Sequence, residues 1–207
     1  MLWLITGGIG SGKSAFADEL AYVVGREGIR LSCPPFPEML IEAAIKGTDM
    51  DTEMGSDIRP DFPWTRSDAD ETLAKKLNAI NLDSNFYRAD RRVVVIDSLS
   101  GWLRGVYRRI EAQLPEAEER IEAEWREALE AILAFQGRVI VVTEELSAGL
   151  SMNVREQGYA YRLANANRKL MESSEIVYRM TAGMATELKG YRLKRGSKTD
   201  ENLYPDR

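Results

Sequence analysis

The chain has 207 residues, of which 44% are hydrophobic and 29% charged, as expected for one ordinary globular domain. Its formal net charge of -5 argues against a protein that binds nucleic acid or an anionic membrane, because such proteins carry basic surfaces. The single cysteine, Cys33, excludes an intramolecular disulfide and a zinc site made of several cysteines. The absence of histidine excludes histidine bases, histidine metal ligands and Ser-His-Asp triads.

Membrane and export signals are not found in the sequence. No segment reaches the roughly 18 apolar residues of a membrane helix. The apolar start, residues 1–6, is too short for the core of a signal peptide and lacks a basic leader. We therefore expect a cytoplasmic protein, a compartment in which a free thiol is common.

Apolar runs alternate with amphipathic stretches, a pattern typical of a parallel sheet covered by helices on both faces. We expect one domain over residues 1–195 and a polar, mobile tail over residues 196–207. The acidic stretch 48–70 contains prolines and no sustained periodicity, so a long loop is expected there, either functional or disordered. Strands are predicted at 2–6, 28–33, 93–97, 139–143, 175–181 and 186–194. Helices are predicted at 13–24, 38–46, 68–78, 99–112, 116–135 and 153–173.

The most specific motif follows the first predicted strand. It matches the phosphate-loop pattern G-x-x-x-x-G-K-[ST] and precedes an amphipathic helix, the context that the chemistry requires. In such a loop, glycines let backbone N–H groups point at phosphate oxygens, the lysine reaches the outer phosphates and the hydroxyl binds Mg²⁺. A glycine-rich turn that binds nothing is the alternative. The sequence thus predicts a P-loop NTPase-like α/β fold that binds ATP or GTP through Gly7, Gly8, Ile9, Gly10, Ser11, Gly12, Lys13 and Ser14.

Acidic residues end two further predicted strands. Asp97 follows a β-branched strand and fits the carboxylate that helps Ser14 hold Mg²⁺, although aspartate is also common as a helix cap. Glu144 and Glu145 follow the strand at 139–143, where a carboxylate serves as base or metal ligand, or as plain surface charge. Because the carboxyl ends of parallel strands share one edge of the sheet, these side chains are expected near the phosphate loop.

Taken in order, the motifs resemble the adenosylcobinamide kinase / adenosylcobinamide-phosphate guanylyltransferase family of cobalamin biosynthesis. The resemblance spans about residues 2–189. The segments that carry it are 5–17, the Glu-Met pair at 38–39, Arg59-Pro60, Trp64, 95–100, Trp102, 142–146, Gly149, Asn167, Leu170, Gly183 and Lys189.

This resemblance implies an enzyme with two activities and a trimeric assembly. It implies that the enzyme phosphorylates the aminopropanol hydroxyl of adenosylcobinamide, and then transfers GMP to that phosphate through a guanylylated histidine. It also places on Glu145 the family glutamate of an Asn-Glu pair, and near Asp68 a glutamate that helps hold GTP.

The chain departs from the family at the positions that transfer GMP. The family histidine falls near Ile45 or Lys46, and Glu144 replaces the family asparagine. Lys46 is a conceivable substitute nucleophile, but a solvated lysine before Gly47 is the simpler interpretation.

Two hypotheses follow. The first is a kinase for adenosylcobinamide or another hydroxyl-bearing small molecule, with Lys13 and Glu145 as catalytic residues and guanylyl transfer in doubt. The second is a nucleotide-binding paralogue without corrinoid chemistry, which regulates or scaffolds.

Overall fold

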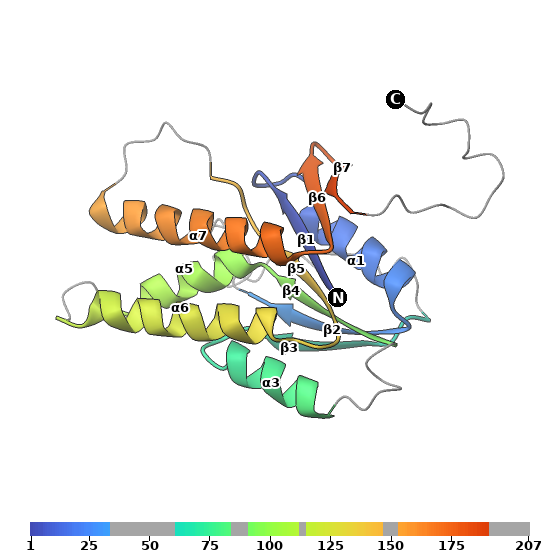
Figure 1. Cartoon of the computed structure of the whole chain (residues 1–207), viewed down its shortest axis with the longest axis horizontal. Coiled ribbons are helices and arrows are strands. Elements are labelled where there is room, and N and C mark those ends of the chain that lie inside the picture. Colours follow the sequence, from blue (N-terminus) through green and yellow to red (C-terminus); the bar gives the residue numbers. More distant parts are fainter. Residues whose placement is uncertain (34–60, 84–90, 112–114, 147–152, 191–207) are drawn as a thin grey trace, which may run out of the picture.

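The computed structural model describes residues 1–33, 61–83, 91–111, 115–146 and 153–190. Within them lies a seven-stranded sheet with the strand order β3-β2-β4-β5-β1-β6-β7 (Figure 1). All neighbouring strands run parallel except β6 and β7, which form an antiparallel hairpin. The strands are β1 Leu2–Gly7, β2 Glu27–Ser32, β3 Trp64–Asp68, β4 Arg92–Asp97, β5 Arg138–Val142, β6 Ile176–Thr181 and β7 Met184–Lys189.

Helices cover both faces of the sheet, as the sequence predicts, but unequally. On one face, α1 packs against Trp3, Ile5 and Val95, with Phe62 and Trp64 completing the layer. On the other face, α3, α5, α6 and α7 form a larger core with Leu4 and the other inward residues of the strands (Figure 1). The helices are α1 Lys13–Val24, α3 Leu73–Asp83, α5 Leu99–Arg109, α6 Ala117–Leu133 and α7 Val154–Ser173.

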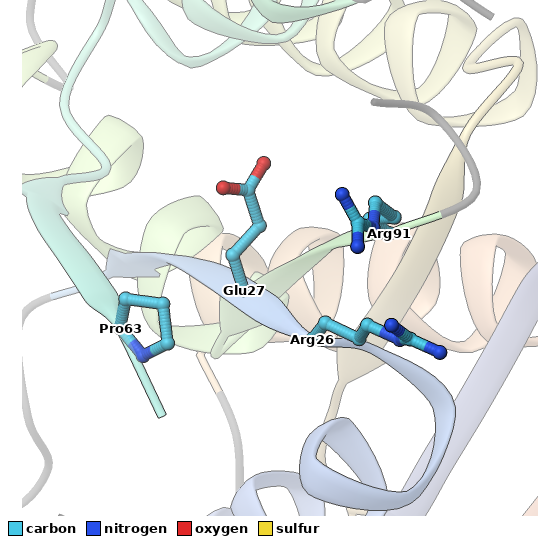
Figure 2. A pocket seen from close by; sticks show the side chains of 4 residues that line it. All are labelled: Arg26, Glu27, Pro63 and Arg91. Atoms are coloured by element: carbon cyan, nitrogen blue, oxygen red, sulfur yellow. The ribbon is translucent and has the colours of Figure 1, made fainter. Parts of the chain in front are cut away.

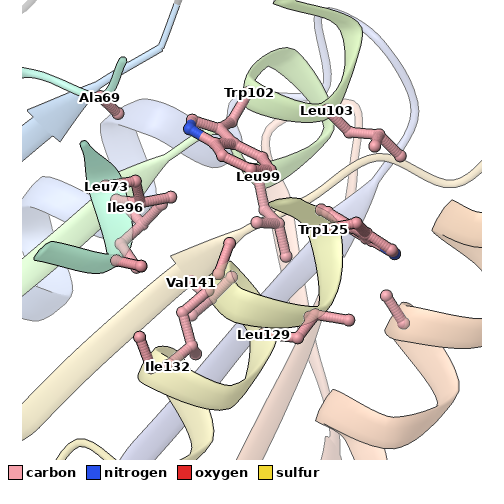
Figure 3. Packing of buried hydrophobic residues seen from close by; sticks show 14 of the residues in the cluster. Ala69, Leu73, Ile96, Leu99, Trp102, Leu103, Trp125, Leu129, Ile132 and Val141 are labelled. Atoms are coloured by element: carbon pink, nitrogen blue, oxygen red, sulfur yellow. The ribbon is translucent and has the colours of Figure 1, made fainter. Parts of the chain in front are cut away.

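Two tryptophans join the helices of the larger core. The rings of Trp102 and Trp125 stack with centroids 6.0 Å apart, which links α5 to α6 (Figure 3). The indole N–H of Trp102 donates to the carbonyl of Asp70, 2.7 Å away, and so fixes the turn before α3. Buried indoles need such a partner, and here the bond ties α5 to the loop that leaves β3.

Three predicted elements are corrected by the structure. β3, Trp64–Asp68, lies within the stretch 48–70 that was expected to be a loop. The helix expected at 68–78 begins only at Leu73 and continues to Asp83, because the chain first completes β3 and a turn held by Asp70. The last strand is Met184–Lys189 instead of 186–194. The helix expected at 38–46 and the tail at 196–207 lie outside the described residues.

Candidate nucleotide-binding site

The phosphate loop leaves the carboxyl end of β1, and glycines allow its backbone path. Gly7 has φ +150°, and a Cβ placed there would lie 2.4 Å from the carbonyl oxygen of Met180. Gly12, at the start of α1, has φ +91°, in the left-handed region that side chains other than glycine rarely adopt. The motif glycines at these positions therefore set the path of the loop into the helix.

Backbone hydrogen bonds tie the loop to both of its neighbours in the sheet. The N–H of Glu145 donates to the carbonyl of Gly7 over 3.1 Å, and the N–H of Gly183 donates to the carbonyl of Ser11 over 3.0 Å. The first bond comes from the end of β5 and the second from the turn between β6 and β7. Meanwhile Gly8, Ile9 and Gly10 at the tip are exposed, so a loop held at its base presents its tip to solvent.

Lys13 lies at the centre of the site. Its side chain is mostly buried, and its Nζ donates to the carbonyl of Gly8 over 2.6 Å. Burial lowers the pKa of Lys13, and the nearby charges of Glu144, Asp97 and Glu145 oppose that shift. The predicted acidic residues of β4 and β5 are thus brought within electrostatic range of the phosphate-loop lysine, while the half-buried Ser14 follows it in the first turn of α1.

Asp97 is held by an arginine that the sequence analysis did not single out. Arg30 Nη2 lies 2.5 Å from Asp97 Oδ2, and Arg30 Nη1 lies 2.5 Å from both carboxylate oxygens of Asp18. Burial raises the pKa of Asp18, although the Arg30 charge opposes that shift. The alternative role of Asp97 as a helix cap is wrong, because Ser98 caps α5 by accepting a bond from the N–H of Gly101.

Glu144 and Glu145 each pair with a different arginine. Glu144 is buried and lies 3.0 Å from Arg104 Nη2 on α5, so it is not plain surface charge. Glu145 Oε2 lies 2.8 Å from Arg179 Nη2 on β6, and its Oε1 accepts a bond of 3.3 Å from the hydroxyl of Thr6.

One polar side chain of α7 fixes the strand end that carries these glutamates. The amide of Asn167 donates to the carbonyl of Glu144 over 2.9 Å and accepts from the hydroxyl of Thr143 over 2.8 Å. Sequence reasoning noted Asn167 only as part of the family resemblance and missed this bridge.

Asp68 is not brought beside Lys13. It ends β3, an edge strand four steps from β1 in the strand order, or about 19 Å at the usual spacing of strands. Its carboxylate is exposed, and its backbone carbonyl accepts a bond of 2.6 Å from Lys76. The structure does not group Asp68 with the phosphate loop, and its contact with a nucleotide stays a prediction.

The residues at this edge fit a magnesium ion that arrives with a nucleotide. Mg²⁺ is usually held in proteins by one or two carboxylates together with substrate phosphates and water. Ser14 and Asp97 supply a hydroxyl and a carboxylate. No group of three or more acidic, cysteine or histidine side chains suited to a metal occurs within the described ranges.

An open pocket of about 390 Å³ lies at the opposite edge of the sheet (Figure 2). Its lining residues stand where β2, β3 and β4 begin: Arg26, Glu27, Pro63 and Arg91. The pocket is therefore separate from the phosphate loop, which lies where the strands end.

A phosphate loop between a buried strand and a helix, with acidic residues at the ends of neighbouring parallel strands, defines an α/β protein of the P-loop nucleotide-binding class. The family model of cobinamide kinase / cobinamide phosphate guanyltransferase matches residues 3–188, and the chain belongs to this family. No individual curated protein matches the chain significantly. The family is one of enzymes of cobalamin biosynthesis that use nucleoside triphosphates and corrinoid substrates. None of the helices in the described part of the chain has the length and apolar character needed to cross a bilayer.

Proposed function

We propose that the chain is a nucleotide-dependent kinase that phosphorylates adenosylcobinamide, and that it does not transfer GMP through a covalent enzyme intermediate. The observation that carries the proposal is the position of Lys13, buried at the base of the phosphate loop and within range of Asp97, Glu144 and Glu145. Family membership supports the choice of a corrinoid as acceptor.

In the proposed reaction, the acceptor hydroxyl oxygen bonds to the γ-phosphorus and the bond to the nucleoside diphosphate breaks. The loop amides and Lys13 stabilise the charge that develops on the transferred phosphoryl group. Ser14 and Asp97 would hold Mg²⁺, which would neutralise charge on the phosphates. Glu145, fixed by Thr6 and Arg179, orients the hydroxyl and accepts its proton.

The first experiment measures phosphoryl transfer from ATP or GTP to adenosylcobinamide, together with the shift in melting temperature that each nucleotide causes. A ligand that binds only the native state raises its melting temperature. We expect Lys13→Ala to abolish transfer and most of the shift. Lys169→Ala, on the exposed face of α7, is the matched control and should behave as wild type.

Two further variants test the assigned roles. Asp97→Asn and Glu145→Gln should lower turnover more than nucleotide affinity, because each acts on the metal or the acceptor. Wild-type turnover in both would refute these roles. Nucleotide binding without transfer to any corrinoid would instead favour the second hypothesis, a paralogue that regulates or scaffolds. That hypothesis is motivated by Glu144, which replaces the family asparagine and pairs with Arg104.

The absence of histidine carries the second half of the proposal. A covalent guanylyl-enzyme needs a nucleophile that attacks the α-phosphate, and a lysine amine with an ordinary pKa of about 10.4 is mostly protonated near neutrality. Lys46, the conceivable substitute, lies outside the described residues. Incubation with α-labelled GTP and Mg²⁺, followed by peptide mapping, should give no adduct. A stoichiometric GMP adduct lost in Lys46→Ala would overturn this view.

The resemblance also supports a homotrimer. Light scattering of the purified chain tests the assembly, and a monomer across the accessible concentration range would contradict it.

A further inference from the structure

The guanidinium of Arg30 lies between two carboxylates at the nucleotide site. It bonds to Asp18 on α1 and to Asp97 at the end of β4, and all three side chains are mostly buried, with 11%, 15% and 12% of their surfaces exposed, respectively. The bond to Asp97 uses Oδ2 of its carboxylate.

This bridge occupies the position beside the proposed magnesium ligands. Asp18 follows Ser14 by four residues, so the two side chains share one face of α1, one turn apart. Asp97 pairs in register with Ser32, the last residue of β2, and Arg30 lies two residues before that end on the same face of the strand. Arg30 therefore places a fixed positive charge against Asp97 and against Asp18, one helix turn from Ser14.

We propose that Arg30 is the resident counter-ion of Asp18 and Asp97, and that it prevents these carboxylates from binding a divalent cation until a nucleotide supplies its phosphates. The inference rests on the proposed nucleotide site but not on the identity of the acceptor. With Arg30 in place the three side chains carry a net charge of about -1, and without it about -2. Mg²⁺ sheds its water reluctantly and is bound through anionic ligands, so a positive charge held against these carboxylates weakens their affinity for the ion.

The bridge has a simpler interpretation as a stabilising ion pair. Buried ion pairs by themselves are weak evidence for stability, because the loss of solvation offsets their attraction. A purely structural pair would change the melting temperature when removed, but it would leave the affinity for a divalent cation unchanged. Metal affinity in the absence of nucleotide therefore separates the two roles.

The experiment titrates the nucleotide-free protein with Mn²⁺, a spectroscopic substitute for Mg²⁺, and follows the free ion by electron paramagnetic resonance. We expect Arg30→Gln to bind Mn²⁺ at least about ten-fold more tightly than wild type, which corresponds to about 1.4 kcal/mol. The gain should disappear in the double variant Arg30→Gln/Asp97→Asn. Arg26→Gln, which removes the same charge from the opposite end of β2, is the matched control and should change affinity far less.

Arg30→Lys guards against a variant that fails to fold, because it keeps the charge and should retain the weak metal binding of wild type. The wild-type protein supplies an independent measurement. Its affinity for Mn²⁺ in the presence of a non-hydrolysable nucleoside triphosphate should be at least about ten-fold higher than the affinity of the protein alone, and at least about ten-fold higher than that of the nucleotide alone. Two results would overturn the proposal. In the first, nucleotide-free wild type binds Mn²⁺ as tightly as Arg30→Gln does. In the second, Asp97→Asn weakens the binding of Mn²⁺ to nucleotide-free protein that still carries Arg30. The test measures metal binding and not phosphoryl transfer, so failure of this proposal can be distinguished from failure of the proposed kinase activity.

Discussion

Asn167 offers a sharp test of how the fold positions the acidic end of β5. Its side chain bridges the Thr143 hydroxyl and the Glu144 carbonyl, at 2.8 Å and 2.9 Å. Asn167→Ala removes both bonds and leaves a hydroxyl and a carbonyl buried without partners, since Thr143 and Glu144 are 0% and 8% exposed. At about 1–2 kcal/mol for each group, the free energy of unfolding should fall by about 3 kcal/mol.

For a chain of this size that loss corresponds to a fall in melting temperature of roughly 6–12 °C. Asn165→Ala is the matched control, because Asn165 is also half-buried on α7 and takes no part in this bridge. The control cancels the gain in helix propensity that alanine brings. Thermal and urea unfolding of both variants give the comparison. If the two variants unfold at the same temperature, the bridge does not hold the end of β5.

Two further predictions concern α3 and the edge of the sheet. Hydrogen bonds from Thr72, the shorter 2.5 Å long, lower the pKa of Asp70 to about 2, so its stabilising effect is present above pH 4 and is lost as the pH falls toward 2. Asp70→Asn should therefore lower the melting temperature at pH 7 but not at pH 2, and an equal loss at both pH values would contradict this assignment. Gly28→Ala places a Cβ 2.4 Å from the ring of Trp64, and urea unfolding should show a loss of about 1–3 kcal/mol. Unchanged stability would mean that Trp64 does not pack against β2 as described.

The sequence predicts the buried strands well because their residues are apolar on both faces. β1, β4 and β5 are almost entirely buried, and their apolar runs stand out from the polar helices. The sequence does not predict β3, which is an edge strand with one neighbour. Its residues are exposed or only half-buried, so the strand lacks an apolar run. Polar side chains are tolerated there, and Trp64 is the only apolar residue of the strand.

The candidate site likewise contains parts that the sequence predicts and parts that it does not. The phosphate loop is predictable because one continuous segment contains the whole motif. The partners of its acidic neighbours are not predictable, because Arg30 is 67 residues from Asp97 and Arg104 is 40 residues from Glu144. One signal does exist: Arg30 interrupts a predicted strand between Ile29 and Leu31, and a charged residue at such a position needs a buried partner.

The loop and its acidic neighbours come from the ends of β1, β4 and β5, which are adjacent only after the central sheet has assembled. The last bond to the loop comes from Gly183, beyond β6. A nascent chain therefore has no phosphate site until most of its length has left the ribosome and paired. Retention on immobilised nucleotide would then select complete molecules from truncated or misfolded ones, and hydrogen exchange in the presence of nucleotide should slow across the whole sheet together.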